Sequence, residues 1–261
     1  MSKYIKTLDI SGKHALITGA SSGIGRACAF MLAERGARLT LVARREQMLL
    51  SVRSEILENH PDVSIDVIVL DVTDKEAGMA LPDRAGRVDI LINSAGLALG
   101  TSKADNFDLK DAERMFETNA IASISFFRAF VPMMRKVNSG HVVNIGSVAG
   151  FECYEGGSVY SASKHAILAF SNAARMDLVD TDVKVTVINP GIVDTEFWNV
   201  RFNGDAEKAA GALKGIEPLT SWDIAYQVMS SITRPQNSQI AEIRSYCNHQ
   251  AHAKYVIYRK V

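Results

Sequence analysis

Short, nearly continuous apolar runs alternate along the chain with longer segments whose apolar residues recur at helical spacing. The apolar runs predict strands at 14–18, 38–43, 65–70, 89–92, 141–145 and 184–188. A seventh strand is expected at 241–247, after a helix that begins near Thr220. Such runs are typical of strands buried on both faces of a parallel sheet. The amphipathic segments predict helices at 24–35, 46–58, 110–136 and 159–178, and another after the N-cap Thr220. The alternation predicts an α/β fold, a doubly wound parallel sheet of about seven strands with helices on both faces.

Composition adds little to this picture. The chain has 261 residues, of which 47% are hydrophobic and 22% charged, which excludes collagen-like, disordered and disulfide-framework proteins. Neither a repeat nor a linker interrupts the pattern, so we expect one domain over 1–261. The segment 74–87, with Gly78, Pro82 and Gly86, has the weakest helical pattern.

Charge and targeting signals point to a soluble protein. The 29 basic residues balance the 29 acidic ones, so no overall charge favours a nucleic-acid or membrane partner. Cys28, Cys153 and Cys247 lie too far apart for a zinc site or a disulfide framework, and we expect no metal. The chain has neither a signal-peptide core nor an apolar stretch of membrane-spanning length, which predicts a cytoplasmic location.

A glycine-rich turn follows the first predicted strand and opens the first helix. Small residues allow a pyrophosphate to approach the backbone, and the free N–H groups at a helix start favour negative charge. This position in a doubly wound sheet predicts a dinucleotide site of Rossmann type, the alternative being a turn without a ligand. The candidate binding residues are Gly19, Ser21, Ser22, Gly23, Ile24 and Gly25.

The second predicted strand ends in Arg44 and Arg45. An enzyme that prefers NAD usually places a carboxylate at this point to accept from the ribose 2′-hydroxyl, whereas guanidinium groups can pair with a 2′-phosphate. The sequence therefore predicts NADP, although solvated arginines would look the same. Asp71 and Val72, at the end of the third strand, are candidates for holding the adenine, unless Asp71 is only a turn residue.

Tyr160 and Lys164 stand one helical turn apart, so their side chains project from the same helix face. Ser147 follows a predicted strand, and Asn119 lies inside the long helix at 110–136. In an open α/β sheet, ligands bind at the carboxyl ends of the strands. An ammonium group near the phenol of Tyr160 would lower its pKa and make it a base.

At this point the chain resembles the short-chain dehydrogenase/reductase family over nearly its full length. The resemblance rests on the glycine turn, Asn93-Ser94-Ala95-Gly96, Asn119, Ser147, Tyr160-Ser161-Ala162-Ser163-Lys164 and Pro190-Gly191. Two positions depart from the family pattern. Ser94 replaces the second asparagine of the usual Asn-Asn-Ala-Gly, and Ser22 stands where many NADP-using members have a basic residue.

The resemblance implies a catalytic set of Asn119, Ser147, Tyr160 and Lys164. Tyr160 would exchange a proton with the substrate oxygen while Ser147 hydrogen-bonds the same oxygen. Lys164 would also hold the nicotinamide ribose, and Asn119 would bind a water that links Lys164 to solvent. Further cofactor residues implied by the resemblance are Asn93, Ala95, Gly96, Tyr160, Pro190, Gly191, Val193 and Thr195. From the residues alone, Asn119 could equally be a helix-kink residue, Thr195 a cap and Ser147 a turn residue.

A finer resemblance concerns the substrate. The run from Thr195 to Asp205 is similar to the NADP-dependent 3-hydroxy acid dehydrogenase branch, which oxidises serine, allo-threonine and related acids. We expect a substrate lid near 194–216, on which Arg201 would pair with the substrate carboxylate. Arg201 could equally be solvated or paired with Asp205 or Glu207, and Trp198 and Phe202 are expected to pack the lid. The pocket-wall candidates are Cys153, Tyr154 and Glu155.

Other functions remain open at this stage. The same hydride chemistry could serve an NADPH-dependent carbonyl reductase that acts on 3-oxoacyl thioesters or ketones. A dinucleotide-sensing module without turnover is a third reading, which the intact Ser147, Tyr160 and Lys164 disfavour. The helix at 159–178 is apolar around most of its circumference and needs burial on two sides. It therefore predicts self-association, as a homotetramer like those common in the family, or as a dimer.

Overall fold

The computed structural model describes residues 7–257 and contains a single seven-stranded parallel sheet within that range. The strand order is β3-β2-β1-β4-β5-β6-β7, which is the doubly wound arrangement that the sequence predicts. The strands are β1 His14–Thr18, β2 Arg38–Ala43, β3 Ile65–Val69, β4 Ile90–Asn93, β5 Gly140–Ile145, β6 Val183–Pro190 and β7 Glu242–Ser245. Each predicted strand is present, with bounds that differ by at most two residues.

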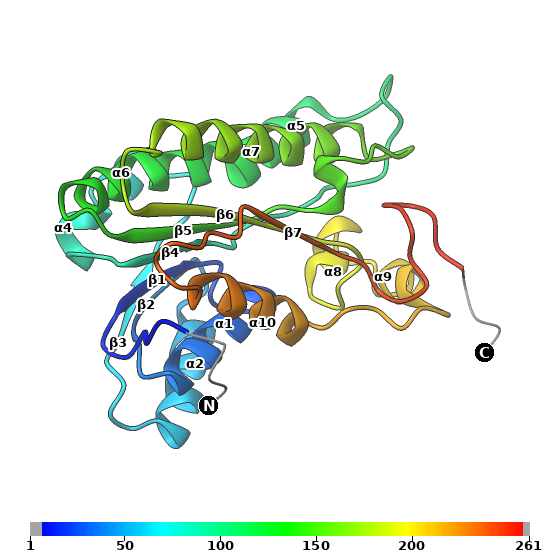
Figure 1. The fold of residues 1–261 in the computed structure, drawn as a ribbon. Coiled ribbons are helices and arrows are strands. Elements are labelled where there is room, and N and C mark those ends of the chain that lie inside the picture. Colours follow the sequence, from blue (N-terminus) through cyan, green and yellow to red (C-terminus); the bar gives the residue numbers. More distant parts are fainter. Residues whose placement is uncertain (1–6, 258–261) are drawn as a thin grey trace.

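Helices cover both faces of the sheet (Figure 1). One face carries α1 Gly23–Glu34, α2 Glu46–Asn59 and α10 Ser221–Ile232; the other carries α5 Leu109–Phe116, α6 Ala122–Lys136 and α7 Ser158–Asp177. Successive strand side chains point to opposite faces. Ile17 accordingly packs in the core under α1 and α10, while Leu16 packs in the core under α6. Burial on both faces explains why the central strands β1 and β4 are largely apolar without alternation.

Two helical predictions need correction. The segment 110–136 is not one α-helix, because the π-helix η1 Glu117–Ile121 lies between α5 and α6. Such a bulge turns backbone and side chains away from regular spacing and is frequent at functional sites. The segment 74–87 forms two short helices, α3 Lys75–Met79 and α4 Leu81–Ala85. Gly86 ends α4 with a φ of 70°, which only glycine adopts without strain.

The chain order places a crevice at the carboxyl ends of β1 and β4. These strands are neighbours, although β2 and β3 come between them in the sequence, so their following loops diverge to opposite faces. The segment after β6 folds beside this crevice as α8 Phe197–Arg201 and α9 Ala206–Leu213. A capping box between Thr220 and Asp223 then starts α10 at the predicted position. No helix within 7–257 combines the length and the apolarity needed to cross a membrane.

Candidate active site

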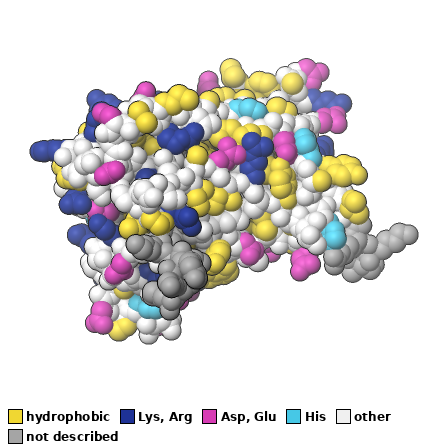
Figure 2. Space-filling model, in the orientation of Figure 1, with side chains coloured by type: hydrophobic (Ala, Val, Ile, Leu, Met, Phe, Trp, Pro, Cys, Tyr) yellow, Lys and Arg dark blue, Asp and Glu magenta, His cyan; other side chains and the backbone are white. Residues whose placement is uncertain are grey.

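A cavity of ≈ 820 Å³ lies at the carboxyl ends of the strands. It runs from the glycine turn after β1 to the segment 195–202, and residues 253, 254 and 256 also line it. The face of the molecule that Figure 2 shows carries basic and acidic side chains intermixed, in keeping with the net charge of zero. The residues that line the cavity fall into two halves: the cofactor half, with its lining residues in 19–24, 43–45, 70–72 and 94–96, and the substrate half, with its lining residues in 147–160 and 197–202 and at 253, 254 and 256.

The glycine turn of the cofactor half has no room for side chains. A Cβ on Gly19, whose φ is 66°, would lie 2.9 Å from the backbone nitrogen of Ala95. A Cβ on Gly25 would lie 2.5 Å from the carbonyl oxygen of Gly19. Gly25 therefore does not line the cavity but lets α1 approach the turn. The Thr18 hydroxyl accepts hydrogen bonds from the backbone of Ser94 and Ala95, which joins this turn to the loop after β4.

The two arginines after β2 line the cofactor half in different settings. Arg45 donates to Ser21 Oγ at 3.2 Å, to Ser22 Oγ at 2.8 Å and to Glu196 Oε2 at 2.9 Å. Arg44 lies 3.6 Å from the carboxylate of Asp71. A guanidinium beside the hydroxyls of the phosphate turn fits a ribose 2′-phosphate. The sequence gives no sign of this role of Glu196, because the carboxylate lies far from Arg45 along the chain.

Asp71 and Val72 also line the cofactor half. Partial burial acts to raise the pKa of Asp71, but hydrogen bonds from the backbone and hydroxyl of Thr73, together with the charge of Arg44, hold it below its usual value. This carboxylate is therefore ionised and able to accept from an adenine amino group. These residues, the glycine turn and Arg45 together make a chemically consistent receptor for NADP.

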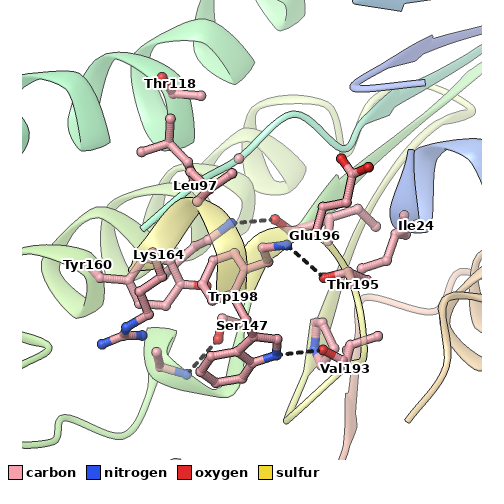
Figure 3. Close-up of a pocket in the computed structure, with 18 of the residues that line it drawn as sticks. Ile24, Leu97, Thr118, Ser147, Tyr160, Lys164, Val193, Thr195, Glu196 and Trp198 are labelled. Atoms are coloured by element: carbon pink, nitrogen blue, oxygen red, sulfur yellow. Dashed lines mark hydrogen bonds between the residues drawn. The ribbon is translucent and has the colours of Figure 1, made fainter. Parts of the chain in front are cut away.

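Ser147, Tyr160 and Lys164 converge where the two halves of the cavity meet (Figure 3). Ser147 follows β5 and its hydroxyl accepts from the backbone of Ala149 at 3.1 Å, while Tyr160 and Lys164 project from α7. The Lys164 ammonium lies 5.9 Å from the centre of the Tyr160 ring and donates to the Ile145 carbonyl at 2.9 Å. Burial lowers the pKa of Lys164 to about 8.

The environment of the Tyr160 hydroxyl differs from the expectation. Burial raises the pKa of Tyr160 well above its ordinary value, and Tyr154 adds to the rise, while the hydrogen bond from Ser147 and the charge of Arg201 oppose it. The prediction that Lys164 gives Tyr160 a lowered pKa is therefore wrong for this structure, because desolvation outweighs the nearby charges. The phenol is protonated at neutral pH, which suits an acid that donates a proton to a carbonyl oxygen.

Two predicted asparagines do not reach the cavity. Asn119, in η1, accepts from the Leu97 backbone at 2.8 Å and donates to the Leu97 carbonyl and to Ser163. Asn93, at the end of β4, donates to Asn144 at 2.8 Å. Both side chains are buried, so they brace the loops under the site rather than line it. Asn119 nevertheless lies under Gly96, where an added Cβ would meet both its Oδ1 and Lys164 Nζ.

The remaining predicted cofactor residues lie on the cavity wall. These are Gly19, Ser21, Ser22, Gly23, Ile24, Ala95, Gly96, Pro190, Gly191, Val193 and Thr195. Thr195 is also a local cap, because its hydroxyl accepts from the backbone of Phe197 at 3.3 Å. Its methyl group lies 3.5 Å from where a Cβ on Gly23 would be, so the lid begins directly against the phosphate turn.

Arg201 occupies the substrate half as a buried cation with 6% exposure. It donates to Tyr154 Oη at 2.9 Å and to the Gly156 carbonyl at 3.4 Å. The alternative pairing with Asp205 is not seen, because Asp205 binds Lys208 instead. Phe197 packs on Tyr160, and Trp198 stacks on Phe202 and donates to the Val193 carbonyl. Trp198 and Phe202 thus pack against each other within the segment 194–216, and both also line the cavity.

The segment after β7 was not predicted to reach the site. Glu152 accepts hydrogen bonds from the Tyr246 hydroxyl and from the Ala253 backbone, both at 2.6 Å, and so holds this segment beside the cavity. Lys254 donates to the Glu155 carbonyl at 3.1 Å. No pattern in the sequence signals these contacts, because they join single residues from distant parts of the chain. Of the three expected wall residues, Tyr154 and Glu155 line the cavity, whereas Cys153 does not.

Comparison with known proteins agrees with this geometry. The model of the short chain dehydrogenase family matches residues 13–205. The NADP-dependent 3-hydroxy acid dehydrogenase of Schizosaccharomyces pombe is 41% identical over 96% of this chain and 98% of its own. The serine 3-dehydrogenase of Agrobacterium fabrum is 36% identical over 94% and 98%, respectively.

A solved structure gives the same result for the fold. The closed form of a serine dehydrogenase complexed with NADP+ superposes with a TM-score of 0.87 at 34% identity, covering 95% of this chain and 100% of the other. The similarity covers nearly the whole chain, so this chain and that structure share the same fold. The chain belongs to the short-chain dehydrogenase family.

Proposed function

We propose that the protein is an NADP-dependent oxidoreductase that reversibly oxidises the hydroxyl group of short 3-hydroxy acids such as serine, allo-threonine or 3-hydroxypropionate. The observation that carries the proposal is the buried guanidinium of Arg201 in the cavity that also holds Tyr160. A buried cation is costly unless an anion accompanies it. A substrate that carries a carboxylate beside its reacting hydroxyl supplies that anion when it binds.

The chemistry divides among four side chains. A bound nicotinamide cofactor would supply hydride transfer, to and from the carbon that carries the substrate oxygen. In the reductive direction the Tyr160 phenol gives its proton to the substrate oxygen, and in the oxidative direction the fraction of Tyr160 present as phenolate takes the hydroxyl proton. Ser147 lies beside Tyr160 and donates a hydrogen bond to the same substrate oxygen. Lys164 supplies positive charge behind the phenol, together with Arg201 on the substrate side.

The lid contributes position and exclusion of water. Arg201 ends α8 and Phe197 begins it, so the carboxylate partner and an aromatic contact of Tyr160 lie on one short helix. Arg201 can form a bidentate, charge-assisted pair with a carboxylate, which fixes the orientation of the substrate as well as its charge. Holding the reacting carbon in one orientation converts part of the binding energy into rate.

NADP is the proposed cofactor because Arg45 lies against both serines of the phosphate turn. The proteins that this chain resembles in sequence and structure include one described as NADP-dependent and one complexed with NADP+. A 2′-phosphate beside Arg45 would gain charge-assisted hydrogen bonds that a 2′-hydroxyl cannot provide.

A direct assay tests the function. The formation of NADPH is followed spectrophotometrically with serine, 3-hydroxypropionate and 3-hydroxyisobutyrate, and the same panel is repeated with NAD+. Oxidation of at least one acid, faster with NADP+, is expected. No measurable oxidation of any of the three acids, together with rapid reduction of ketones or 3-oxoacyl thioesters, would instead identify a carbonyl reductase with the same hydride chemistry.

We also propose that the protein assembles through α7, as a homotetramer or a dimer. The outer face of this helix carries Ala162, Ala169, Ala173 and Met176, all exposed, and Met176 has 72% of its surface accessible. Small residues along one helix face allow a second helix to approach closely, and closed symmetry is usual for such contacts. Light scattering should give a dimer or tetramer mass, and Ala169→Arg should give the monomer mass. A monomeric wild-type protein would refute this assembly.

A further inference from the structure

Tyr154 lies in the loop between β5 and α7 and lines the same cavity as Ser147 and Tyr160. Its ring packs against Gly157, where an added Cβ would lie only 2.3 Å from the ring carbon Cε2 of Tyr154. Gly156 has a φ of 76°, and a Cβ there would lie 2.6 Å from the Thr101 carbonyl oxygen. The missing side chain of Gly157 therefore leaves the space that the Tyr154 ring occupies on the cavity wall.

The hydroxyl of Tyr154 has one proton left to donate. Arg201 Nη1 lies 2.9 Å from Tyr154 Oη, and a guanidinium can only donate, so the phenol oxygen accepts this bond. Within residues 7–257 the Tyr154 hydroxyl has no other hydrogen-bond partner. Its O–H is therefore free to bind an acceptor that enters the cavity.

The charge of Arg201 is unmatched in this part of the site. The guanidinium carbon lies 5.5 Å from the centre of the Tyr154 ring and 5.9 Å from that of Tyr160. Among the described residues no carboxylate lies within 4.0 Å of it. The two acids nearest in sequence to Tyr154 are engaged elsewhere, because Glu152 binds Tyr246 and the Ala253 backbone, and Glu155 pairs with Lys103.

We propose that Tyr154 is a specificity-determining residue whose hydroxyl donates a hydrogen bond to the same substrate carboxylate that Arg201 pairs with. This inference rests on the proposed function and deepens it. A carboxylate has two oxygens, so it can accept from the guanidinium and from the adjacent phenol at once. A neutral group in the same place would leave Arg201 buried without an anion, so the pair also discriminates against uncharged substrates.

The test compares 3-hydroxypropionate with its methyl ester, which has the same reacting hydroxyl and no charge. Tyr154→Phe removes only the hydroxyl and keeps the ring against Gly157. We expect kcat/KM for the acid to fall about 10-fold, as for loss of a hydrogen bond to a charged group, while kcat/KM for the ester changes by less than about twofold. The loss should appear mainly in KM, because the bond is made in the bound substrate and in the transition state alike.

Tyr246→Phe is the matched control. It makes the same chemical change at a hydroxyl that binds Glu152, in the neighbouring loop and outside the cavity wall. It should leave the ratio of acid to ester unchanged, even if a looser loop slows both reactions. An equal loss for acid and ester in Tyr154→Phe, or no loss for either, overturns the inference.

Failure of the proposed function gives a different result. In that case the wild-type protein would oxidise the ester, or reduce a neutral ketone, but not the acid. Inhibition of that neutral reaction by 3-hydroxypropionate then decides the role of Tyr154. Inhibition that is about 10-fold weaker in Tyr154→Phe supports the anion contact. Inhibition of equal strength in both proteins, or absent from both, overturns it.

Discussion

The cofactor half and the substrate half of the cavity are built in different ways. The cofactor half uses short contiguous segments at the ends of β1, β2, β3 and β4, and much of its shape comes from backbone and from glycines without room for a Cβ. The substrate half brings together three distant segments, 152–156, 197–202 and 253–256, through single side-chain contacts. The first half offers a general receptor for a phosphate-bearing ligand, and the second half holds the features that can distinguish one substrate from another.

This difference predicts that mutations in the two halves will have separable effects. Changes in the cofactor half should alter dinucleotide affinity for every substrate. Changes around Arg201 and Tyr154 should alter the choice between charged and neutral substrates with each cofactor. Tyr160 and Lys164 lie at the boundary, and their loss should affect every reaction.

The largest expected effect is that of Tyr160→Phe. Removing the hydroxyl removes the proton donor and acceptor, and a positioned acid or base typically contributes about 10²–10⁴-fold in rate. We therefore expect kcat to fall by that order for acidic and neutral substrates alike. The Kd for NADPH, measured by fluorescence titration, should remain within about threefold of wild type, because the missing hydroxyl acts in the chemical step and not in cofactor binding. Retention of more than a tenth of the activity would show that another group transfers the proton.

The cofactor half is tested next by Arg45→Ala. A hydrogen bond to a charged group contributes about 1.5–3 kcal/mol, so the Kd for NADPH should rise about 10- to 100-fold while that for NADH changes little. Arg44→Ala should have a smaller effect, since Arg44 faces Asp71 rather than the phosphate turn. Replacing both arginines should weaken NADPH far more than NADH.

Arg26→Ala is a matched control for this experiment, because Arg26 pairs with Glu55 and does not line the cavity. It should leave both affinities unchanged. An equal loss of NADH and NADPH binding in Arg45→Ala would refute recognition of the 2′-phosphate.

The lowered pKa of Lys164, which lies where the two halves of the cavity meet, predicts that the reaction rate depends on pH. Because burial lowers the pKa of Lys164 to about 8, this group is charged below that pH and neutral above it. The reductive kcat/KM should be flat at neutral pH and fall about tenfold per unit above about pH 8, since Tyr160 itself stays protonated there. Lys164→Arg should move any such fall to higher pH, and a fall at the same pH in that variant would assign it to another group.

A smaller effect on NADPH affinity is expected at Glu196, whose contact with Arg45 joins the two halves of the cavity. Glu196 precedes α8 and holds the Arg45 side chain with its carboxylate, 2.9 Å away. A 2′-phosphate must share or displace that carboxylate, and both partners are about half exposed, so the exchange is worth little. Glu196→Gln should tighten NADPH binding by roughly two- to fivefold, with NADH unaffected. Weaker NADPH binding in this variant would mean that Glu196 helps to position Arg45 rather than competing for it.

The same contrast explains how far the sequence predicts the structure. The strands and the glycine turn follow from patterns within a few residues, such as the apolar run 14–18 and the small residues from Gly19 to Gly25. The sequence also predicts that Tyr160 and Lys164 share a helix face. The sequence does not predict the π-helix at Glu117–Ile121. Asn119 within it makes a buried hydrogen bond with the Leu97 backbone, and no local spacing in the sequence indicates that contact.

The depth at which a side chain is buried is the other property that could not be predicted from the sequence. The pKa of Tyr160 depends on how much protein surrounds its hydroxyl, and the depth of that site is a property of the packed loops rather than of the Tyr160–Lys164 spacing. The contact between Glu152 and the segment after β7, and the one between Arg45 and Glu196, likewise depend on long-range packing. Arg201 was predicted to face the substrate, but its partner Tyr154 became apparent only from their 2.9 Å contact.

The most direct test of the account is the selectivity ratio of Arg201→Ala, measured as kcat/KM for 3-hydroxypropionate divided by kcat/KM for its methyl ester, with NADP+. We expect the wild-type protein to prefer the acid and the variant to lose at least about 10-fold in this ratio, through loss of the acid reaction alone. A wild-type protein that oxidises the ester as well as the acid, or a variant whose ratio does not change, would contradict the claim that a buried guanidinium selects an anionic substrate.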